Sequence, residues 1–67
     1  MAEQQDKRGI IIRITGPVLD VRFPEGQEPP IKTLLVTETE PPVHVEVAQH
    51  QSPGVVRAIA LEPTEGL

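Results

Sequence analysis

The residues of this chain that could do metal or acid–base chemistry are two histidines and a scatter of carboxylates. A zinc site needs three or four ligands, and Glu46 could join His44 on one strand face. Strand alternation places His44 on the water-facing side, however, while His50 stands at the entrance to a loop. Because so few ligands converge, we expect no metal site and two solvated or hydrogen-bonded histidines.

The carboxylates and lysines do not form a catalytic pattern either. Asp20 could be combined with Glu46 or Glu62 for acid–base work, but nothing around them indicates the desolvated cleft that would perturb their pKa values. A phosphate-binding loop needs the string Gly-x-x-x-x-Gly-Lys-Ser/Thr, which is absent, and Lys7 and Lys32 follow no glycine-rich run. We therefore expect no catalytic, cofactor-binding or metal-binding residues, and a chain that is not itself an enzyme.

Three arginines are more informative, because they interrupt strand patterns where an apolar residue would serve. They are Arg13, Arg22 and Arg57. Arginine is enriched at protein–protein interfaces, so these residues are candidates for contacts with another protein. Two alternatives remain open: a solvated strand face, or an intramolecular ion pair with Asp20.

Length and composition limit the possible partners. Sixty-seven residues make one domain at most, with a small core and marginal stability. A net charge of −4 would repel a phosphate backbone, and a single aromatic residue leaves no stacking platform, so nucleic acid is not expected as a partner. The longest apolar run covers residues 10–12, and residues 1–8 are polar, so we expect no signal peptide and no direct membrane insertion.

Five segments have the pattern of short strands, at residues 10–15, 18–23, 33–37, 43–48 and 55–61. In the first, Ile10, Ile12 and Ile14 share one face, as in a half-buried strand. Ile11 points the other way, so it is exposed or covered by a neighbour, which makes it a fourth interface candidate. In the last segment two assignments remain open, with either Val56, Ala58 and Ala60 or Val55, Ile59 and Leu61 facing inward.

Turn signals separate these segments. Gly16-Pro17 ends the first, and Ser52-Pro53-Gly54 predicts a type II turn with glycine at the position that requires positive φ. We therefore predict an all-β fold: a small closed or nearly closed antiparallel Greek-key-like barrel of five to six short strands over residues 9–67, after a flexible arm at residues 1–8. A further turn signal at residues 62–66 would lead into a sixth strand, so we expect the barrel to lack its last strand.

Several strings in this order and spacing resemble the N-terminal β-barrel domain of the rotary F-type ATP synthase β subunit, rather than its non-catalytic α sister. They are Gly16-Pro-Val-Leu-Asp-Val21, Glu46-Val-Ala-Gln-His50, Val55-Val-Arg-Ala-Ile-Ala-Leu61 and Pro63-Thr-Glu-Gly-Leu67. Two departures are Ser52-Pro53-Gly54, where the family has a Gly-Asp-rich turn, and Lys32-Thr33, where it has Tyr-Asn. A third is that the family continues into a further strand and a nucleotide-binding domain.

The resemblance implies a role in assembly. In that family the domain is a six-stranded barrel, and barrels of alternating α and β subunits form the crown of the F1 hexamer, which makes and hydrolyses ATP coupled to proton transport. The partners would be α-subunit barrels, with self-association through an unpaired strand edge. Mg-ATP would bind in the parent subunit's other domains. The location would be peripheral, on the cytoplasmic face of a bacterial membrane or on the matrix or stroma side of an organelle membrane. The alternative is an independent small barrel that binds a protein or a ligand.

Overall fold

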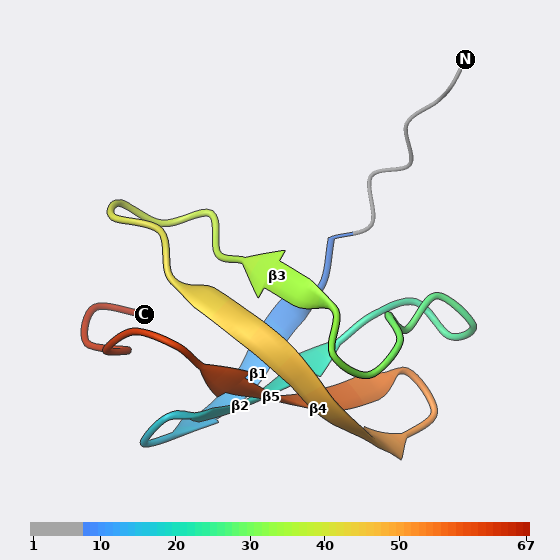
Figure 1. Cartoon of the computed structure of the whole chain (residues 1–67). Coiled ribbons are helices and arrows are strands. Elements are labelled where there is room, and N and C mark those ends of the chain that lie inside the picture. The colour runs from blue at the N-terminus through green and yellow to red at the C-terminus, as the bar shows by residue number, and fades with distance from the viewer. Residues whose placement is uncertain (1–7) are drawn as a thin grey trace.

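The computed structural model describes residues 8–67, and within that range it consists of strands and loops without a helix (Figure 1). The strands are β1 (Ile10–Thr15), β2 (Val18–Arg22), β3 (Leu34–Val36), β4 (His44–Ser52) and β5 (Val55–Ala60). The predicted arm, residues 1–8, lies outside the described residues except for Arg8. All five strands predicted from the sequence are present. The largest difference between predicted and observed bounds is in β4, which was predicted at residues 43–48.

The strands form a single antiparallel sheet in the order β1-β2-β5-β4-β3. The consecutive strands β3, β4 and β5 are neighbours, and β2 returns to lie beside β5 after the long connection formed by residues 23–33, which is the Greek-key arrangement. Figure 1 shows the sheet coiled into a barrel-like shape. The sheet is not closed, because β1 and β3 are its two edges. The predicted all-β Greek-key fold is confirmed in this open form.

The core lies on the concave side of the coiled sheet and is entirely apolar. In an antiparallel sheet, residues directly opposite each other lie on the same face, so Leu19 opposite Ala58 and Val21 opposite Val56 point inward together. These assignments decide the open question about β5: Val56 and Ala58 are inside, whereas Ile59 is exposed. The buried apolar side chains of the described residues are Leu19, Val21, Phe23, Val43, Val45, Val47, Val56 and Ala58.

The faces of β1 differ from the prediction. A β-bulge separates Ile11, which is opposite Val21, from Arg13, which is opposite Asp20, so Ile12 is an extra residue in the ladder. The bulge breaks the period of two. Ile10, before the bulge, lies opposite Arg22 on the outer face, whereas Ile14, after it, lies opposite Leu19. Ile10, Ile12 and Ile14 are 66%, 42% and 38% exposed, while Ile11 packs against the core. The prediction of a buried face made by the other three isoleucines was wrong.

Strand β4 continues four residues beyond the predicted Ala48, to Ser52, with two bulges against β5. Its second half is polar and exposed, so no apolar alternation marks it in the sequence; backbone hydrogen bonds to β5 hold it in the sheet. The two-residue turn Pro53-Gly54 then joins β4 to β5, and Gly54 has φ of +82°. This positive φ confirms the glycine position predicted for the turn.

Candidate protein-interaction surface

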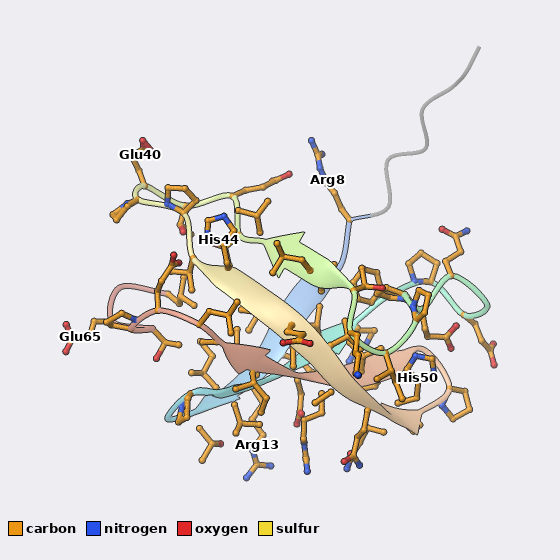
Figure 2. The ribbon with its side chains drawn as sticks, in the orientation of Figure 1. Arg8, Arg13, Glu40, His44, His50 and Glu65 are labelled. Carbon is orange, nitrogen blue, oxygen red and sulfur yellow. The ribbon has the colours of Figure 1, made fainter. Side chains whose placement is uncertain are left out.

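The strand register brings the three predicted arginines onto the convex side of the sheet. Arg13 of β1 is opposite Asp20 of β2, which is opposite Arg57 of β5, so the three side chains form one row. Arg22 lies in the next row. Figure 2 shows Arg13 pointing away from the body of the barrel. We call this surface the arginine face. On β1, β2 and β5 it comprises Arg13, Arg22 and Arg57 with Asp20 and the apolar residues Ile10, Val18, Val55 and Ile59, and Glu46 of β4 lies opposite Ile59 on the same side.

One arginine of this face has a partner within the chain. The Arg57 Nε donates a hydrogen bond to Asp20 Oδ1 at 3.1 Å, and the Asp20 side chain is only 14% exposed. The intramolecular pair considered from the sequence is therefore present. Arg13 and Arg22 are exposed and form no ion pair within residues 8–67. Their guanidinium groups are thus available to a partner molecule, whereas that of Arg57 is engaged.

The apolar residues on the same face are also uncovered. Ile10 lies opposite Arg22, which lies opposite Val55, and Ile59 lies opposite Val18. Ile10 and Ile59 are among the large apolar side chains that remain exposed. Protein–protein interfaces combine an apolar centre with arginines in this manner. The arginine face therefore has the composition of a protein-binding surface.

Ile11, the fourth predicted interface residue, lies on the opposite side of the sheet. It lines an open groove of about 460 Å³ that lies between the edge strands β1 and β3. The groove has mainly apolar walls, and near one end the Arg8 Nε and Glu38 Oε2 form an ion pair at 2.8 Å. An interface role for Ile11 would therefore involve this groove and not the arginine face.

The histidines occupy separate positions, each with its own partner. The Glu62 carboxylate accepts hydrogen bonds from the His44 backbone N–H at 2.8 Å and lies 3.1 Å from His44 Nδ1. These contacts, the backbone bond first, lower the pKa of the Glu62 carboxyl below its usual 4.5. His50 Nε2 lies 2.7 Å from the Pro29 carbonyl oxygen. Of the two states expected for the histidines, solvated or hydrogen-bonded, both have the hydrogen-bonded one. Within residues 8–67 no group of three or more potential metal ligands comes together.

A second carboxylate, that of Glu28, joins the connection between β2 and β3 to the Pro53-Gly54 turn. Glu28 Oε2 accepts a hydrogen bond from the Gly54 N–H at 2.6 Å, and the Gly54 carbonyl accepts one from the Phe23 N–H at 2.7 Å. The Glu28 and Gly54 backbone N–H groups lower the pKa of the Glu28 carboxyl. Both Glu28 and Glu62 thus stabilise loops, and Asp20 is paired with an arginine. Of the carboxylates considered from the sequence for acid–base work, Asp20 is therefore bonded to Arg57 and Glu62 to His44.

Sequence reasoning found the three arginines but missed the exposed isoleucine Ile10 and the partner of His44. Ile10 precedes the bulge and is exposed because it lies opposite Arg22 on the outer face, a pairing that the alternation of residue types does not reveal. The contact of His44 with Glu62 depends on β4 and β5 being neighbours, and a hairpin prediction from Ser52-Pro53-Gly54 would have brought those two residues to the same end.

Comparison with known families identifies a match over most of the chain. The family described as ATP synthase alpha/beta family, beta-barrel domain, matches this chain over residues 11–67, which is most of its length. The match begins within β1 and includes all of β2 to β5. In the part of the chain that the structure describes, there is no helix of the length and apolar character needed to cross a membrane.

Proposed function

The chain belongs to the ATP synthase alpha/beta family, and from this premise we propose that it is the N-terminal barrel of a β subunit and acts as a non-catalytic assembly module. In this role it packs against barrels of neighbouring α subunits and holds the F1 hexamer together. The assignment to β rather than α rests on the strings around Gly16-Pro17, Glu46–His50 and Pro63–Leu67, which resemble the β subunit.

The observation that carries this proposal is the arginine face. It presents two arginines without an intramolecular ion pair, Arg13 and Arg22, beside the exposed Ile10 and Ile59, on a sheet whose other side is the core. Burying such a surface against another protein removes apolar area from water and gives the free guanidinium groups carboxylate partners. Membership of this family makes other ATP synthase subunits the expected partners.

Several properties of the parent subunit follow as parts of the proposal. Mg-ATP binds to another domain of the parent, and the barrel contributes no group to ATP synthesis, ATP hydrolysis or proton transport. The assembly is peripheral to a membrane, on the cytoplasmic face in bacteria or on the matrix or stroma side in organelles. The strand edges of β1 and β3 are additional places where this chain could associate with itself.

A second candidate function is favoured by the groove between β1 and β3. A groove of about 460 Å³ with largely apolar walls lies within the size range of small-molecule sites. In this alternative the chain is an independent barrel that binds a ligand or a peptide there. The two proposals place the partner on opposite sides of the sheet, so they can be separated by experiment.

The direct test is co-elution of the chain with a purified ATP synthase α subunit in size-exclusion chromatography. We expect a complex at micromolar concentration, because standard protein interfaces reach such affinities. The variant Arg13→Glu/Arg22→Glu should weaken it, whereas Glu25→Gln, in the connection between β2 and β3, should not. An α subunit that elutes separately from the wild-type chain at all concentrations tested would overturn the assembly role.

A further inference from the structure

The two edge strands of the sheet differ in how well they are protected against pairing with another chain. Natural proteins protect their edges by keeping them short or by placing prolines, charges or bulges there. The edge strand β3 has only three residues and lies between loops that contain prolines. The other edge strand, β1, has six residues, of which four are isoleucine. Its protective features are Arg13 and the bulge at Ile12, so β1 is the more open of the two edges.

The backbone N–H and C=O groups of Ile14 point out from this edge. The Ala60 N–H donates a hydrogen bond to the Pro17 carbonyl at 2.7 Å, which fixes the alternation of the ladder between β2 and β5. Along an antiparallel strand, residues that bond to one neighbouring strand alternate with residues that bond to the other. Leu19, two residues after Pro17, therefore directs its backbone groups toward β5 and not toward Ile14, the residue opposite it in β1. The backbone groups of Ile14 are thus available to a strand outside the sheet.

The side chains of β1 add apolar area on both sides of the sheet. Ile10 lies on the arginine face, whereas Ile14 lies opposite Leu19 on the other side. Both are exposed, as is Ile12 between them. Branched aliphatic residues of this kind are favoured in strands and in pairs across neighbouring strands. A six-residue segment with high strand propensity, one charge and no proline or glycine also has the composition of segments that pair with copies of themselves.

We propose that two copies of this chain pair antiparallel through their β1 strands, so that their two sheets become one continuous sheet. Both copies use the same strand, so the contact is two-fold and closes as a dimer, whereas pairing of β1 with β3 would repeat into an open chain. Antiparallel pairing sets the two Arg13 side chains apart in every register except the one centred on Arg13, so the like charges do not oppose each other. The contact extends the sheet sideways at its edge, and it does not depend on the assembly role.

Sedimentation equilibrium of the whole chain over a range of concentrations tests this proposal with two matched variants. Ile12→Lys/Ile14→Lys places lysines on the β1 edge, and Leu34→Lys/Val36→Lys makes the same kind of change on the β3 edge. The first variant should dimerise at least about tenfold more weakly than the wild type, because lysines on an edge oppose its pairing with an identical edge. The second should dimerise as the wild type does. Amide NMR spectra of each variant verify that it is folded.

Amide hydrogen exchange of the wild-type chain locates the contact without any substitution. Once dimers dominate, exchange at the Ile14 amide should be at least about tenfold slower than in the monomer, because its N–H bonds to the second copy, whereas exchange at the Leu34 amide of β3 should stay unchanged.

Three results would overturn the proposal: a wild-type chain that is still monomeric at about 1 mM, slower exchange at β3 in place of β1, or association that continues beyond the dimer. The variant Ile12→Lys/Ile14→Lys keeps Arg13 and Arg22, so it should still bind the α subunit if the assembly role is correct. Each of the two proposals can therefore fail without the other.

Discussion

Val55 and Val56 are consecutive residues of β5 on opposite faces, and the same substitution at each tests the assignment of the core. Val56 is fully buried, whereas Val55 lies on the arginine face opposite Arg22 and is partly exposed. Replacing Val56 by alanine removes two methyl groups from a close-packed core. At about 0.8 kcal/mol per buried CH₂ the transfer cost is about 1.6 kcal/mol, and an unfilled cavity raises the loss to about 2 to 3 kcal/mol.

The effect should be large relative to the stability of the domain. A single core in a chain of this size supplies at most about 3 to 5 kcal/mol, so Val56→Ala removes about half of it or more. Val55→Ala should cost only about 0.5 to 1 kcal/mol, from the lower strand propensity of alanine and a small loss of packing. The two variants are chemically identical changes, which makes each the control for the other.

Urea unfolding followed by far-UV circular dichroism measures the difference, because the chain has no tryptophan or tyrosine to report by fluorescence. With a slope of about 1 kcal/mol/M, Val56→Ala should lower the midpoint by about 2 to 3 M and Val55→Ala by less than about 1 M. Equal losses at the two positions, or a larger loss at Val55, would refute the assignment of the faces of β5.

Two further predictions concern charges. Arg57→Ala should destabilise the fold by about 1 to 2 kcal/mol, because it leaves the largely buried Asp20 carboxylate without its partner. Arg13→Ala should change the free energy of unfolding by less than about 0.5 kcal/mol. Equal values for the two variants in urea unfolding would contradict the different roles of these arginines. The pKa of Glu62 is lowered in the folded state from 4.5 by hydrogen bonds from His44, so its contribution to stability is present above that value and is lost as the pH falls through the lower, folded pKa. The wild-type urea midpoint should therefore fall more between pH 7 and pH 3 than that of Glu62→Gln, and an identical fall in both would contradict the role of this carboxylate.

Apolar alternation explains which parts of this fold could be predicted. In β2, Leu19 and Val21 alternate with charged residues, and both are buried as the alternation predicts. In β4, Val45 and Val47 alternate with polar residues and are likewise buried. In β5 both faces carry aliphatic residues, so only the register with β2 decides that Val56 is inside. The residue types of β5 therefore do not show which of its two faces is buried.

Other features depend on contacts that alternation does not describe. The bulge in β1 arises from the pairing with β2 and reverses the face of the isoleucines after Ile11. The polar half of β4 is a strand because β5 supplies its hydrogen bonds. For the candidate site, the residue types identified Arg13, Arg22 and Arg57, but only the topology shows that they share one face and that Asp20 holds one of them.

An amide NMR titration of the isotope-labelled chain with an ATP synthase α subunit would report whether the barrel binds and through which side. We expect shifts or broadening concentrated on β1, β2 and β5, at Ile10, Arg13, Arg22 and Ile59, with smaller changes at the groove-lining Leu35. Changes confined to β3 and the groove would contradict the arginine face as the contact surface. Spectra unchanged by the α subunit would contradict the assembly role itself.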